Sequence, residues 1–134
     1  MIGVVICTHG PLAEALLDTV HMIVGEFPQA ATVSVRRGDA VEAVLDRLRV
    51  AITQVDSGEG VLILCDMFGG TPSNLSLSLL ERAEVLTGVN LPMLLKLYTT
   101  REGPVAEVAA AVRDHARDNM LVAGELLRSR AVKS

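Results

Sequence analysis

GVLILCDMFGGTPSN, residues 60–74, is the most informative stretch of this chain. A short run of Val, Leu and Ile ends at an ionisable side chain, Asp66, and then turns through glycines and a proline into a helical pattern. The first apolar run has the same design, because residues 2–8 end at His9 just before a Gly-Pro turn. Each stretch therefore predicts a buried strand followed by a helix.

Outward from these two stretches, strand and helix patterns alternate along the chain with few residues between them. The expected strands are residues 2–8, 31–35, 61–66, 85–89 and a short final segment, 120–127. The expected helices are residues 12–27, 39–55, 72–83, 92–98 and 104–118, with Asp39 as the cap of the second one. Alternation of this kind predicts an α/β fold with a doubly wound, mostly parallel sheet and helices on both faces.

Composition limits the remaining possibilities. A chain of 134 residues that is 50% apolar fits one domain, residues 1–134, with a real core. The net charge of −4 and the lack of a basic stripe disfavour nucleic acid as a partner. The apolar runs are far too short to span a bilayer, so we expect a soluble, cytoplasmic protein. A mean hydropathy of +0.42 suggests that apolar surface is buried against another subunit, so we expect an oligomer.

His9 and Asp66 are the candidate reactive pair. The carboxyl ends of parallel strands are where ligands and chemistry lie in open α/β sheets, so both side chains are expected at one crevice. A carboxylate that accepts a hydrogen bond from Nδ1 of an imidazole fixes the tautomer and leaves Nε2 as a nucleophile. A single histidine near a strand end is, taken alone, more often a structural or surface residue. The matching position of Asp66 favours a phosphoryl carrier instead.

The loop after Asp66 is the expected phosphate-binding element. Its candidate residues are Gly69, Gly70, Thr71 and Ser73, whose backbone N–H groups and hydroxyls can meet phosphate oxygens. An ordinary strand-to-helix turn, with Thr71 as the helix cap, is the plain alternative, and both can hold at once. The loop has no lysine after its glycines, and no G-x-G-x-x-G follows any strand, so neither ATP nor another cofactor is expected.

The other reactive side chains receive simpler interpretations. His21 and His115 lie on the polar faces of their expected helices and are read as solvated surface residues. Cys7 and Cys65 lie inside buried strands and are expected to be reduced thiols. A metal centre built from a thiolate with His9 and Asp66 stays open as an alternative, but no metal is the preferred interpretation.

The segment 36–39, Arg-Arg-Gly-Asp, follows the second expected strand. It has two interpretations. Because it ends a strand of the same sheet, it could face the crevice and meet an acidic partner. We interpret it as a solvated loop.

Three motifs together resemble a known family. They are THG at residues 8–10, DMFGGTPSN at residues 66–74 and TGVNLPML at residues 87–94. In this order they resemble the enzyme IIA domain of the mannose-family sugar phosphotransferase system, over essentially the whole chain. Family members often carry Trp where Phe68 stands and an aromatic or small residue where Pro11 stands, so we expect partner contacts to differ here.

The resemblance implies a function and an assembly. His9 would accept a phosphoryl group from the histidine-containing phosphocarrier protein and pass it to an enzyme IIB partner. Asp66 would orient the ring, and Thr71 with neighbouring loop amides would bind the phosphate. The family exchanges its last, antiparallel strand between two subunits, so residues 120–127 are expected to do so in a homodimer. No linker follows, so we expect enzyme IIB to be a separate protein.

Three alternative functions remain to be weighed. A receiver-like domain phosphorylated on aspartate would need an acidic cluster beside the first strand, where this chain has Cys7, Thr8 and His9. A phosphohistidine subunit of a dihydroxyacetone kinase system would use the same residues without sugar transport. A non-catalytic binding module is the third. The segment 88–93, GVNLPM, favours the sugar-type family.

Overall fold

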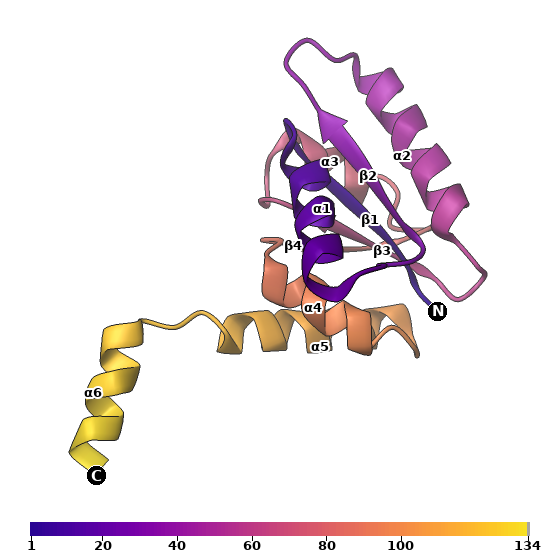
Figure 1. Cartoon of the computed structure of the whole chain (residues 1–134). Helices are drawn as coiled ribbons and strands as arrows, with labels where there is room; N and C mark the ends of the chain where they lie inside the picture. Colours follow the sequence, from indigo (N-terminus) through magenta and orange to yellow (C-terminus); the bar gives the residue numbers. More distant parts are fainter. Residues whose placement is uncertain (134) are drawn as a thin grey trace.

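Four parallel strands form one sheet in the computed structural model, which describes residues 1–133. The strands are β1 Gly3–His9, β2 Ala30–Val35, β3 Val61–Cys65 and β4 Glu84–Thr87. The helices are α1 Leu12–Val24, α2 Val41–Val55, α3 Thr71–Leu77, α4 Leu91–Thr99, α5 Val105–Asp118 and α6 Ala123–Lys133. The α/β architecture expected from the alternating pattern is confirmed (Figure 1).

The sheet has the order β2-β1-β3-β4. The chain leaves β1 toward one edge to form β2 and then crosses back over β1 to form β3, so the direction of winding changes between β1 and β3. Cys7 lies opposite Cys65 in the β1 to β3 register. The carboxyl ends of these two strands therefore lie side by side, and this is the position at which α/β sheets of this kind bind ligands.

Helices cover both faces of the sheet, and each face has its own buried cluster. One cluster joins β1 and β3 to α1, α4 and α5 through residues such as Ile6, Leu64, Leu94 and Val112. The other joins them to α2 through residues such as Leu48 and Ile63, with side chains following α3 packed beside it. Burial on both faces explains why β1 and β3 are continuous apolar runs without polar alternation.

A buried arginine fixes the amino ends of the strands. Arg101 is only 6% exposed, and its guanidinium donates to the carbonyls of Ile2 and Gln29, both at 2.9 Å. It also lies over the Phe27 ring, 4.9 Å from the ring centroid. Because these contacts lie at the end of the sheet opposite His9, they stabilise the fold without entering the crevice.

The prediction of a final strand at residues 120–127 is wrong for this structure. Met120, Leu121 and Val122 are irregular and exposed, and the chain then continues as α6. Val122 and Leu126 are four residues apart, which is a helical spacing, and the segment is rich in the helix formers Ala, Glu, Leu and Arg. With no strand beside it, this segment satisfies its backbone groups locally, and α6 stands away from the other elements (Figure 1).

Two smaller expectations also need correction. The third helix, expected over residues 72–83, ends at Leu77, and hydrogen-bonded turns complete the path to Ala83. Its cap residue is Gly70, while Thr71 is already the first helical residue. The extra turns bring Leu79 and Ala83 into the core, so the apolar pattern persists after the regular helix has ended.

Candidate functional site

His9 and Asp66 meet at the carboxyl ends of β1 and β3. Nδ1 of His9 lies 2.8 Å from Oδ2 of Asp66, and the backbone N–H of His9 donates to the same oxygen at 3.1 Å. The His9 side chain is 49% exposed, whereas that of Asp66 is 15% exposed. The Asp66 carboxylate is thus largely buried, whereas the His9 imidazole is half-exposed to solvent.

Asp66 is held in its ionised form. Partial burial raises the pKa of its carboxyl, but hydrogen bonds from the ring and backbone of His9 more than offset this, so the pKa lies below its ordinary value. Its other oxygen, Oδ1, accepts from the backbone N–H of Met67 at 3.0 Å. Because an ionised carboxylate only accepts hydrogen bonds, Nδ1 of His9 carries the proton in their shared bond. The neutral ring then has an unprotonated Nε2.

Gly70 lies directly against the His9 ring. A Cβ at this position would lie 2.6 Å from Cε1 and 3.2 Å from Nε2 of His9. The φ of Gly70 is −86°, so its backbone is open to any residue and the glycine is needed only for space. The sequence indicated a flexible glycine loop, but it gave no signal of this particular contact.

Ser73 supports the glycine loop from beneath. It is fully buried, and its hydroxyl accepts from the N–H of Gly69 at 2.9 Å and donates to the carbonyl of Gly70 at 3.1 Å. The side chain of Asn74 donates to the carbonyl of Gly69 at 3.3 Å. Of the four expected phosphate-binding residues, Thr71 therefore lies exposed beside His9, whereas Ser73 shapes the loop.

A cavity of about 530 Å³ opens beside the His9 ring. It is lined by His9, Gly10 and Thr71 on one side and by residues 35–39 of the β2 to α2 loop on the other. The structure thus places segment 36–39 at the crevice, whereas the preferred interpretation of the sequence was a solvated loop; its residues are both exposed and part of the cavity lining. Asp39 does not cap α2 as expected. Its carboxylate instead accepts from the N–H of Arg36 and from Nη2 of Arg47, both at 2.8 Å.

Thr8 contributes a contact that the sequence analysis missed. Its buried hydroxyl accepts from the N–H of Ala13 at 2.8 Å, in the first turn of α1. The cap residue of α1 is Pro11, and its side chain makes no capping hydrogen bond. Thr8 therefore acts as a cap from within β1 and ties the end of the strand, where His9 begins, to the helix that follows. In the sequence, the only sign of this cap is a hydroxyl residue directly before His9.

Cys7 and Cys65 face each other in neighbouring strands, both fully buried with free thiols. The hydrogen bond with Cys65, together with burial, raises the pKa of Cys7, so this thiol stays protonated and unreactive. Among residues 1–133, no group of three or more His, Cys, Asp and Glu side chains is arranged to hold a metal ion. His21 lies exposed on α1 and His115 is half-buried on α5, both away from the crevice.

Comparisons with known proteins agree on one family. The family model described as "EIIA-man: PTS system fructose IIA component" matches residues 3–114. The mannose-specific EIIAB component of the phosphotransferase system from Escherichia coli is 35% identical over 104 residues, which cover 75% of this chain and 32% of that protein. This chain therefore spans about a third of the length of that relative. The fructose-specific EIIA component of Bacillus subtilis is 34% identical, covering 76% of this chain and 72% of the relative.

Solved structures show that the fold is shared. A mannose/sorbose-specific IIA subunit from Enterococcus faecalis superposes with a TM-score of 0.81 at 27% identity, covering 90% of this chain and 93% of that one. An EIIA component from Streptococcus agalactiae superposes with a TM-score of 0.84 at 23% identity, covering 93% and 99% respectively. Within residues 1–133, no helix is both long and apolar enough to pass through a membrane.

Replacing Gly70 by alanine is expected to displace the His9 ring. The new methyl group would overlap Cε1, so the ring must leave Asp66 or the loop must shift, at a cost of about 1–3 kcal/mol in the free energy of unfolding. Gly124→Ala is the matched control, because its methyl group meets only the flexible end of Arg128. Long-range ¹H–¹⁵N NMR of His9 measures the effect. Unchanged His9 signals in Gly70→Ala would contradict this packing.

Asp66 should make the free energy of unfolding depend on pH in the acidic range. Its folded pKa lies below the ordinary value of 3.8, so its stabilising contribution is complete above that value and is lost as the pH falls through the folded pKa. The difference in unfolding free energy between the wild type and Asp66→Asn should therefore shrink as the pH falls from about 4 through the folded pKa. Urea unfolding at each pH measures it. Asp46→Asn, at a side chain that is 72% exposed, is the control. A difference that grows in acid would disprove the assignment.

Proposed function

The chain belongs to the EIIA-man family of sugar phosphotransferase components, and on this premise we propose that it carries a phosphoryl group on His9. The group would come from the histidine-containing phosphocarrier protein and pass to an enzyme IIB partner, for sugar uptake or for regulation. The bond of 2.8 Å between Nδ1 of His9 and Asp66 is the observation that carries this proposal. It leaves Nε2 as the free nitrogen of a half-exposed ring.

The proposed transfer balances as follows. The lone pair of Nε2 of His9 attacks the phosphorus on the donor, a new N–P bond forms, and the donor's N–P bond breaks with its electron pair returning to the donor imidazole. His9 then carries a phosphoryl group and a positively charged ring. Asp66 balances that charge through Nδ1–H, and the donor departs unphosphorylated. Transfer to the acceptor repeats these steps in reverse at the same nitrogen.

Thr71 and Gly70 are the proposed phosphate-binding residues beside His9. Thr71 is exposed and lines the same cavity as the His9 ring, which supports a hydrogen bond from its hydroxyl or N–H to a phosphoryl oxygen. Gly70 lets the loop approach the ring closely. Gly69 and Ser73 would act through the shape of the loop, because their N–H and hydroxyl already bond to each other. This refines the expectation that all four residues bind phosphate directly.

We also propose that the active form is a homodimer. β4 is an edge strand that pairs on one side with β3. A groove of about 200 Å³ runs between β4 and α5, lined by residues 84–86 and by α5 side chains. Met120, Leu121 and Val122 are each more than 60% exposed. This irregular segment would become extended on pairing with β4 of a second copy, which would bury both surfaces and satisfy the open edge of the sheet.

Phosphorylation should occur on His9. Incubation with phosphoenolpyruvate, enzyme I and the phosphocarrier protein is expected to give an acid-labile, base-stable adduct that mass spectrometry places on this residue. His9→Ala should abolish labelling, while His21→Ala and His115→Ala should retain it. Asp66→Asn should slow transfer by about 10- to 100-fold, because an amide does not balance the charge of the ring. Full labelling of His9→Ala would rule out the proposal.

The assembly is tested separately by sedimentation of the full chain at micromolar concentration. A dimer is expected, with a thermal midpoint that rises with protein concentration. Deletion of residues 120–134 should give a less stable and less soluble monomer, because the edge of β4 stays open. A well-folded monomer of the full chain would contradict the dimer and leave the chemistry of His9 untouched.

A further inference from the structure

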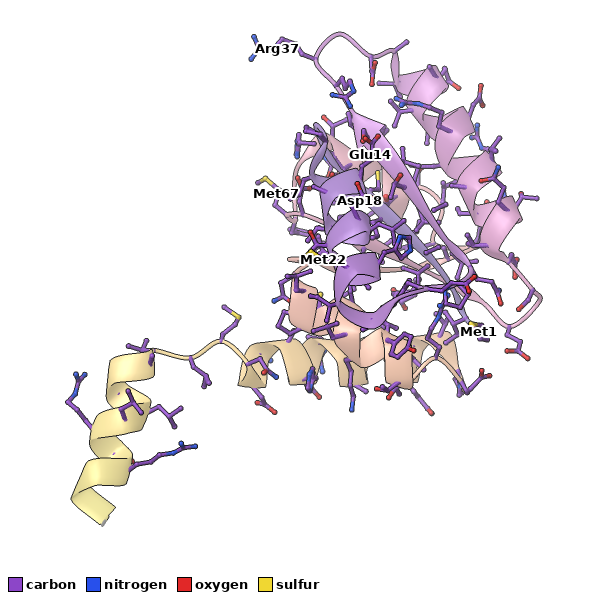
Figure 2. All side chains as sticks on the ribbon, viewed as in Figure 1. Met1, Glu14, Asp18, Met22, Arg37 and Met67 are labelled. Carbon is purple, nitrogen blue, oxygen red and sulfur yellow. The ribbon has the colours of Figure 1, made fainter. Side chains whose placement is uncertain are left out.

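Two arginines line the cavity beside the His9 ring. Arg36 and Arg37 follow β2 and line this cavity together with His9 and Thr71. Both are exposed, and Figure 2 shows Arg37 projecting from the tip of the loop between β2 and α2. In a chain with a net charge of −4, this places adjacent positive charges beside the proposed phosphoryl acceptor.

The loop that carries the arginines is held in one shape. Asp39 accepts from the backbone N–H of Arg36 and pairs with Arg47 at 2.8 Å, and Arg47 also donates to the carbonyl of Ser34 at 2.9 Å. Gly38 turns the chain with a φ of +87°, a conformation that favours glycine. The contacts that fix the loop use the backbone of Arg36 and leave its guanidinium free.

Within the described residues, neither the Arg36 nor the Arg37 guanidinium group forms an ion pair. Within residues 1–133, the arginines in ion pairs are Arg47, Arg49 and Arg113, and no Asp or Glu lies within ion-pair distance of Arg36 or Arg37. Asp39 also lines this cavity, and the backbone N–H of Arg36, the Arg47 side chain and the charge of Arg36 lower its pKa. Its Oδ2 is already bonded to that N–H and to Nη2 of Arg47. A guanidinium offers several N–H donors in a planar fork that matches the oxygens of a phosphoryl group. A phosphoryl group carries close to two negative charges at neutral pH.

We propose that Arg36 and Arg37 form an anion-binding wall that holds the phosphoryl oxygens in the His9 cavity. The role toward phosphorylated His9 rests on the proposed function, whereas the affinity of the wall for a free phosphate does not. The wall stabilises the phosphorylated form of this chain relative to that of its donor. It therefore sets how the phosphoryl group is distributed between the two proteins.

Titration of the unphosphorylated protein with inorganic phosphate, followed by amide NMR, tests the wall directly. Phosphate should shift the signals of Gly10, Gly38 and Thr71. Arg36→Gln/Arg37→Gln should weaken binding by about threefold to tenfold at low ionic strength, and the difference should shrink in salt. The lysine pair, Arg36→Lys/Arg37→Lys, should retain much of the affinity. Arg49→Gln/Arg113→Gln is the matched control and should bind phosphate like the wild type.

The equilibrium of phosphoryl groups between the phosphocarrier protein and this chain is the second measurement. The glutamine pair should lower the phosphorylated fraction of His9, expressed as an equilibrium constant, by a similar factor. Equal titrations and equal equilibria for all proteins would overturn the wall and leave the proposed function intact. Arginine-dependent phosphate binding without any phosphorylation of His9 would support the wall and overturn the proposed function. Normal phosphate binding with weakened affinity for the unphosphorylated phosphocarrier protein would assign the arginines to that partner's carboxylates and overturn the wall.

Discussion

One oxygen of Asp66 accepts two hydrogen bonds from His9, one from the backbone and one from the ring. This shared acceptor depends on the register of the sheet. β1 and β3 are adjacent and parallel, and Cys7 lies opposite Cys65, so the two strands end side by side. The other features of the site are arranged around it. Thr8 ties β1 to α1 on one side, and the loop supported by Ser73 brings Gly70 against the ring on the other.

The two ends of the sheet carry different features. At the amino ends, Arg101 links Ile2, Gln29 and Phe27 through buried contacts, beside a smaller cavity of about 390 Å³ that Arg101 also lines. At the carboxyl ends, polar groups bond mainly to their own loops, and a cavity of about 530 Å³ stays open. Parallel strands allow this division because all their carboxyl ends lie on one side.

The sequence predicted the features that follow from local patterns. Continuous apolar runs identified β1 and β3, and the ionisable residue after each run identified His9 and Asp66. Contacts between distant segments left no such pattern. The approach of Gly70 to the ring, the cap from Thr8 and the pairing of Arg47 with Asp39 all depend on how loops fold back in space. The final strand was misassigned because apolar residues suggested burial, although their spacing suited a helix.

The His9 ring is fixed at both its backbone and Nδ1, so Nε2 has little freedom to move sideways. A reactive nitrogen that stays in one place, beside one cavity, can face only one macromolecule at a time. Any two proteins that exchange a phosphoryl group through it must compete for the same surface and must visit it in turn. Under the proposed function, transfer through His9 would therefore follow ping-pong kinetics, and an excess of either partner protein would inhibit the other.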